Sequence, residues 1–103
     1  MIVIIEKHRE DISTLCRENG VKELYVFGSA LGSDWDSEKS DIDFLLELDE
    51  MPPSRRLDAY FDLLDGLRSL FGKVDLVMID ALKNPYLRKE IMKTREAVFG
   101  TES

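Results

Sequence analysis

Two aspartates, Asp41 and Asp43, are separated by one residue at the start of the apolar run Ile42–Leu48. Alternate side chains of an extended segment point to the same face, so both carboxylates are expected on one face. Two carboxylates beside apolar residues repel each other and lose hydration, which is costly unless a cation lies between them. Oxygen ligands of this kind suit magnesium or manganese. The pair therefore predicts a divalent-metal site.

A glycine–serine pair, Gly28-Ser29, follows the earlier apolar run Leu24–Phe27. Glycine lets the backbone approach a phosphate closely, and the Ser29 hydroxyl adds a donor. If a helical turn begins here, its free N–H groups would also face the anion. Together with Asp41 and Asp43, the pair predicts phosphoryl or nucleotidyl transfer, in which metals neutralise a triphosphate. The alternative is that the two aspartates only accept backbone N–H groups at a turn.

A third carboxylate, Asp75, stands early in the apolar run that follows Lys73. A charged side chain in such a run needs a partner. Asp75 is the best candidate in this chain for a third metal ligand or a catalytic base. It could instead pair with Lys73 or Arg68.

The elements that would position these residues follow from hydrophobic spacing and from the chain breakers Gly and Pro. We expect the order helix, strand, strand, helix, strand, helix. The expected bounds are a helix from about Ile2 to Glu18, strands Leu24–Phe27 and Ile42–Leu48, a helix capped by Ser54 and ended by Gly72, a strand Lys73–Ile79, and a helix from Asn84-Pro85 to Gly100. This order predicts an α+β fold (an α/β sandwich), a small sheet covered by helices.

Three of these helices should turn apolar side chains inward. The inward residues are predicted to be Ile5, Ile12, Leu15 and Cys16 in the first, Leu57, Tyr60, Phe61, Leu64 and Leu67 in the second, and Leu87, Ile91 and Val98 in the last. Cys16, the one cysteine, is interpreted as a small apolar core residue.

Composition narrows the range of functions. The chain has 103 residues and a net charge of −7, with a pI near 4.7. Its length predicts a single domain over residues 1–103. An acidic surface repels a nucleic-acid backbone, so direct nucleic-acid binding is not expected. A nucleotide can still bind at a metal site, because the metal ion reverses the local charge. No apolar run reaches the ~20 residues of a membrane span, and a cytoplasmic location follows as the default.

The combination of Gly28-Ser29 with Ser40-Asp41-Ile42-Asp43 resembles the signature of the polymerase-beta-type nucleotidyltransferase superfamily. The resemblance covers nearly the whole chain, and its shortness is typical of the minimal members. It implies a small mixed sheet flanked by helices, the nucleotidyltransferase fold. It also implies that Gly28 and Ser29 form a nucleotide-binding turn and that Ser40, in the second motif, is a further nucleotide-binding residue. Asp41, Asp43 and Asp75 match the family's metal-binding, catalytic aspartates, with Mg²⁺ or Mn²⁺ as cofactor and ATP as substrate.

The chain departs from the common pattern after the glycine–serine pair. Many minimal members carry an arginine there, whereas this chain has Ala30-Leu31-Gly32 and no basic residue before Lys39. A trans-acting arginine from a partner could supply the charge near Leu31, as in other phosphoryl-transfer systems.

The resemblance also implies a partner. Many minimal members are encoded with a helical HEPN-class protein and act as antitoxins by attaching AMP to a tyrosine hydroxyl of that protein. Two other functions are compatible with the sequence. One is an antitoxin that acts by docking alone, and the other is nucleotidyl transfer to a small molecule such as an antibiotic, with a partner subunit supplying the acceptor site.

Overall fold

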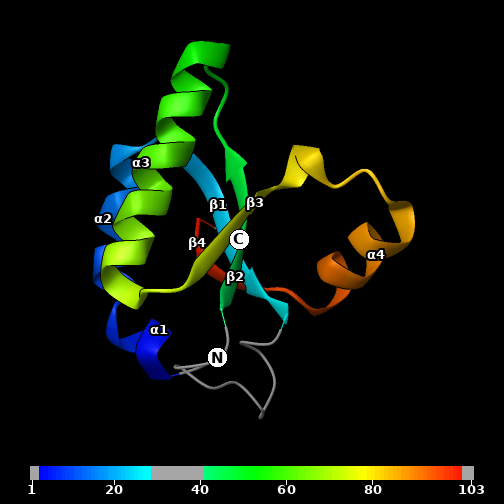
Figure 1. The fold of residues 1–103 in the computed structure, drawn as a ribbon, viewed down its shortest axis with the longest axis horizontal. Coiled ribbons are helices and arrows are strands. Elements are labelled where there is room, and N and C mark those ends of the chain that lie inside the picture. Colours follow the sequence, from blue (N-terminus) through cyan, green and yellow to red (C-terminus); the bar gives the residue numbers. More distant parts are fainter. Residues whose placement is uncertain (1–2, 29–40, 101–103) are drawn as a thin grey trace.

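The computed structural model describes residues 3–28 and 41–100 (Figure 1). This part of the chain forms helices and strands. In chain order they are α1 (Val3–Lys7), α2 (Arg9–Glu18), β1 (Val21–Phe27), β2 (Ile42–Leu48), α3 (Pro53–Phe71), β3 (Val74–Met78), the short 3₁₀ helix η2 (Ile79–Ala81), α4 (Pro85–Thr94) and β4 (Glu96–Phe99).

The strands form one mixed sheet in the order β3-β2-β1-β4. β1 pairs antiparallel with both β2 and β4, whereas β2 and β3 are parallel. Parallel neighbours need a crossover, and α3 provides it. The predicted α+β fold with a small mixed sheet is confirmed.

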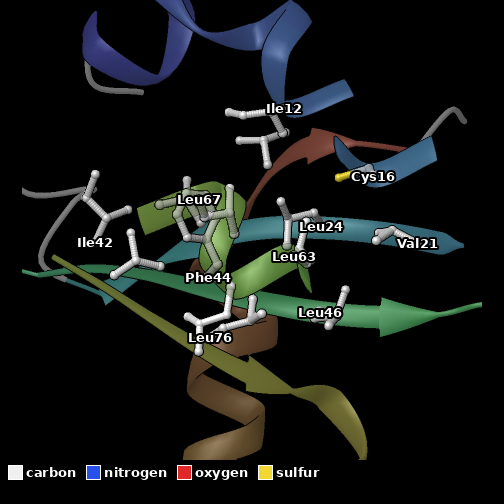
Figure 2. Close-up of a cluster of buried hydrophobic side chains, with 14 of the residues drawn as sticks. Ile12, Cys16, Val21, Leu24, Ile42, Phe44, Leu46, Leu63, Leu67 and Leu76 are labelled. Atoms are coloured by element: carbon white, nitrogen blue, oxygen red, sulfur yellow. The ribbon is translucent and has the colours of Figure 1, made fainter. Parts of the chain in front are cut away.

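The sheet separates two hydrophobic clusters, with α1, α2 and α3 on one face and α4 on the other (Figure 1). Side chains of α2 and α3 meet the strands in the larger cluster, as Figure 2 shows for Ile12, Leu67 and Phe44. Cys16 also lies in that cluster, and burial raises the pKa of its thiol to about 12. This confirms its role as a core residue and leaves the thiol protonated at neutral pH.

Two helices differ from the prediction. The first helix is interrupted at His8, whose imidazole pairs with the Asp11 carboxylate and lies edge-on to Phe71. The third helix begins at Pro53 rather than after a Ser54 cap, because the fixed φ of Pro53 suits the first helical position. Ser54 is therefore inside the helix, and that prediction was wrong.

The C-terminal segment differs more. The predicted helix to Gly100 ends at Thr94, and Glu96–Phe99 forms a fourth strand beside β1. Val98 is buried as predicted but in this strand, whereas Leu87 is 52% exposed and not inward. The helix start is confirmed, since the Asn84 side chain accepts hydrogen bonds from two backbone N–H groups of α4.

The sheet covers only some of the apolar side chains of α3. Leu63, Leu64 and Leu67 are buried, but Leu57 is 60% exposed and Phe61 is 51% exposed. The prediction that Leu57 and Phe61 point into the core was wrong. Among the helices that the structure describes, none is long and apolar enough to cross a membrane.

Candidate functional site

The pairing of β2 with β3 brings two of the predicted aspartates together. Asp43 and Asp75 are direct register partners, and Asp43 is also opposite Phe27 of β1 on its other side. Residues two apart in a strand share a face, so Asp43 and Asp75 lie on the same face as Leu45 and Val77, which pack in the smaller cluster under α4. The two carboxylates therefore lie side by side near the beginning of both strands.

The backbone of Gly28 is in contact with the Asp43 side chain. Gly28 has a φ of +75°, and a Cβ built on it would lie 2.6 Å from Oδ2 of Asp43. A residue with a Cβ would be strained in this conformation and would displace the Asp43 carboxylate. The sequence predicted that Gly28 lets the backbone approach a phosphate, and this stays a prediction. In the structure, the missing Cβ of Gly28 leaves room for the Asp43 carboxylate.

The three carboxylates are electrostatically coupled at Asp43. Burial, the charges of Asp75 and Asp41, and a hydrogen bond with Asp75 raise the pKa of the Asp43 carboxyl above its ordinary value. A hydrogen bond between two carboxyl groups requires a proton on one of them. The charges of the three carboxylates therefore act together on Asp43.

This donor set fits a hard divalent cation. Its side chains offer only carboxylate oxygens, and a cation would relieve the repulsion that raises the pKa of Asp43. Within residues 3–28 and 41–100, however, no group of three or more His, Cys, Asp or Glu side chains is arranged so that it could hold a metal ion. Asp41, which directly precedes β2, is exposed.

Other predicted site residues lie outside the described part of the chain. These are Ser29, Ser40 and the position of the missing arginine near Leu31. Gly28 and Asp41, which border that segment in the sequence, are both described.

Asp80 lies in η2, where its carboxylate pairs with the Arg56 guanidinium at 2.8 Å. The N-cap position of η2 is Met78, and η2 has no side-chain cap. One surface that sequence reasoning missed is a cavity of about 540 Å³ between α3 and β3, lined in part by Leu57 and Phe61. Helical spacing assigned both of these side chains to the core, so it contained no signal for this surface.

Comparison with known proteins gives a consistent result. The sequence pattern of the family described as "Nucleotidyltransferase domain" matches residues 5–98. A candidate protein adenylyltransferase of Methanocaldococcus jannaschii, MJ0128, is 42% identical over 89 residues, which are 85% of this chain and 84% of that protein. The protein adenylyltransferase MntA of Thermococcus cleftensis is 36% identical, over 79% of this chain and 76% of MntA.

Solved structures share the fold. A crystal structure of a toxin–antitoxin with AMP-PNP superposes with a TM-score of 0.65 at 25% identity, over 91% of this chain and 74% of that one. A complex of tri-AMPylated Shewanella oneidensis HEPN toxin with MNT antitoxin gives a TM-score of 0.58 at 23% identity, over 94% and 73%. At that identity the second likeness shows the fold alone.

Proposed function

The chain belongs to the nucleotidyltransferase domain family, and on that premise we propose that it transfers AMP from ATP to a tyrosine hydroxyl of a HEPN-type partner protein. Membership confirms the resemblance noted in the sequence. In the proposal the chain is the antitoxin of a toxin–antitoxin pair, acting in the cytoplasm where ATP is available.

One observation carries the proposal. Strand register places Asp43 beside Asp75 while the Gly28 backbone contacts Asp43, so the two sequence motifs meet at one point. Relatives named for protein adenylyl transfer and a related fold in a complex with AMP-PNP support AMP as the transferred group. The complex with AMP-PNP is a toxin–antitoxin, and this supports a toxin as the partner. The HEPN class of that toxin is what the sequence resemblance implies.

In the proposal, Gly28, Ser29 and Ser40 hold the triphosphate, and Asp41, Asp43 and Asp75 would hold Mg²⁺ or Mn²⁺. Such an ion neutralises charge on the phosphates and on the leaving group. The absence of a Cβ at Gly28 leaves room for Asp43 and for a phosphate oxygen near the backbone.

The reaction is a displacement at the α-phosphorus of ATP. The tyrosine oxygen forms a bond to that phosphorus, the bond from it to the oxygen bridging to the β-phosphorus breaks, and pyrophosphate leaves. The tyrosine proton passes to a carboxylate, for which Asp75 is our candidate because it is on the edge strand β3. The helices of the described chain all cover the sheet, so we expect the partner to position its own hydroxyl.

Co-expression with the HEPN-type protein encoded beside this chain tests the proposal. Both chains should co-purify, and intact-mass measurement after incubation with ATP and Mg²⁺ should show a gain of one or more AMP groups on the partner. Asp43→Asn should co-purify without that gain. Co-purification with no gain from the wild-type chain would favour docking alone, and no co-purification would favour a small-molecule acceptor.

A further inference from the structure

We propose that Tyr86 of this chain is itself an acceptor of AMP, and that a second copy of the chain catalyses the transfer. The inference rests on the proposed function, because it uses the same site and the same reaction with ATP. It adds a modification site on α4 and a second protein substrate, which is this chain.

The three tyrosines of the chain differ in how accessible their hydroxyl groups are. Tyr25 is 7% exposed, and its hydroxyl donates a hydrogen bond to the Glu23 carboxylate. The Tyr60 hydroxyl donates a hydrogen bond of 2.6 Å to the Leu76 carbonyl. Tyr86 is 81% exposed, and its hydroxyl has no hydrogen-bond partner in the described part of the chain. An acceptor oxygen has to reach the α-phosphorus of ATP in a protein site, so Tyr86 is the tyrosine that can react.

The first turn of α4 presents Tyr86 to the outside of the molecule. The Asn84 side chain caps this turn and accepts a hydrogen bond of 2.9 Å from the Tyr86 backbone N–H. Ile91, the buried residue of α4, is five positions further along, which places it about 140° around the helix from Tyr86. The Tyr86 side chain therefore points away from the sheet, on a helix that is packed against it, and can enter the site of another molecule.

Basic residues around Tyr86 distinguish this segment from the rest of an acidic chain. The chain has a net charge of −7, whereas residues 83–95 contain one acidic residue, Glu90, and five basic residues, which are Lys83, Arg88, Lys89, Lys93 and Arg95. Lys89 and Lys93 are exposed and follow Tyr86 by three and seven positions, so all three side chains share one face of α4. The candidate site carries carboxylates and would hold a triphosphate, so the basic face of a second copy is attracted to it.

The geometry of α4 requires that the transfer takes place between two copies. Figure 1 shows α4 running from η2 toward β4. β4 begins at Glu96 opposite Val26, close to the end of the sheet that carries Asp43, so the far end of α4 is the end that carries Tyr86. The helical rise from Tyr86 to Glu96 is about 15 Å, and the Tyr86 side chain points away from the sheet, so it does not reach its own site. Asp75 is exposed on the edge strand β3, which leaves the site open to a second copy.

The reaction step is the one proposed for the partner, with a different acceptor. The Tyr86 oxygen forms a bond to the α-phosphorus of ATP bound to the other copy. The bond from that phosphorus to the oxygen bridging to the β-phosphorus breaks, and pyrophosphate leaves. The hydroxyl proton passes to a carboxylate of the copy that holds ATP, so the product is a phosphodiester on Tyr86.

Incubation of the whole chain alone with ATP and Mg²⁺ tests the inference. Intact-mass measurement should show a gain of one AMP group, and peptide mapping should locate it on Tyr86. Tyr86→Phe should lose this gain. The matched control Tyr60→Phe removes a hydroxyl that is already hydrogen-bonded, and it should keep the gain. A gain that Tyr86→Phe retains would overturn the inference, because the acceptor would then be another residue.

A mixture of two complementary variants tests whether the transfer takes place between copies. Asp43→Asn keeps Tyr86 but should lack transfer, whereas Tyr86→Phe, carrying an affinity tag, keeps transfer but lacks the acceptor. Each variant alone should stay unmodified, and the mixture should place AMP on the Asp43→Asn chain. Adding Lys89→Gln and Lys93→Gln to that acceptor chain should slow its labelling and reduce the salt dependence of the rate. An unmodified acceptor chain, or a rate that the lysine replacements leave unchanged, would contradict the inference.

Transfer to the HEPN-type partner separates this inference from the proposed function. Tyr86→Phe should modify the partner at the wild-type rate, because Tyr86 lies outside the candidate site. A labelled partner together with a wild-type chain that stays unmodified when incubated alone would overturn the inference and leave the proposed function standing. The absence of label on both proteins would contradict the proposed function, and the inference with it.

Discussion

Gly28→Ala perturbs the candidate site at the point where its two motifs meet. The new Cβ would lie 2.6 Å from Oδ2 of Asp43, whereas ordinary contacts begin at 3.4 Å, so the carboxylate must move by roughly 0.8 Å. A displacement near 1 Å can cost about a hundredfold in rate when a reacting group is mispositioned. The positive φ of +75° adds a backbone cost of about 1–2 kcal/mol for a residue with a side chain.

Gly72→Ala is the matched control. Gly72 has a φ of +85° and a ψ of −90°, so a residue with a side chain is strained there too, but a Cβ would meet nothing within 4 Å. Both variants should lose at least about 1 kcal/mol of folding free energy, which lowers Tm by at least roughly 4 °C in a chain of this size. Only Gly28→Ala should lose transfer, by about a hundredfold in kcat/KM, measured as AMP incorporated into the partner.

The comparison of these two variants decides whether the Asp43 position matters. Equal transfer by both folded variants would refute the reasoning, because the displaced carboxylate would then have no effect. Equal loss in both would also refute it, since the effect would be one of stability.

Three further predictions concern the aspartates, the cation and α4. Replacing Asp41, Asp43 or Asp75 by Asn should in each case reduce transfer by at least about a hundredfold. The Tm of the Asp43 variant should hold or rise, because the repulsion that raises the pKa of this carboxyl is relieved. Normal transfer by the variants would show that the three aspartates have a structural role only. ATP binding measured by calorimetry should depend on divalent metal, and equal affinity in excess EDTA would contradict the metal site. Asn84→Ala should lower stability by about 1 kcal/mol in chemical denaturation, because its side chain caps α4; no change would remove that role.

Local signals were sufficient for the elements around the site. The Ile42–Leu48 strand was predicted with the bounds that the structure shows, because five of its seven residues are apolar and polar or chain-breaking residues lie on each side. β4 was missed because it is only four residues long and begins one residue after the end of α4, so it gives no local strand signal. Its pairing with β1 depends on a partner about 70 residues earlier in the chain.

The site itself was predicted by residue type but not by geometry. Spacing indicated that Asp41 and Asp43 belong together, whereas the contact between Asp43 and Asp75 depends on the parallel register of β2 and β3. The exposure of Leu57 and Phe61 was not predictable from helical periodicity, because periodicity identifies the apolar arc but not how much of it the sheet covers.

The central claim is that this chain transfers the α-phosphoryl group of ATP, as AMP, to a partner protein. The most direct measurement incubates the chain and its HEPN-type partner with Mg²⁺ and ATP labelled at either the α- or the γ-phosphorus, followed by denaturing gel electrophoresis. We predict label on the partner from α-labelled ATP only, and none with Asp43→Asn. Label from the γ-position would show phosphoryl transfer instead, and no label from either position on a bound partner would contradict the account.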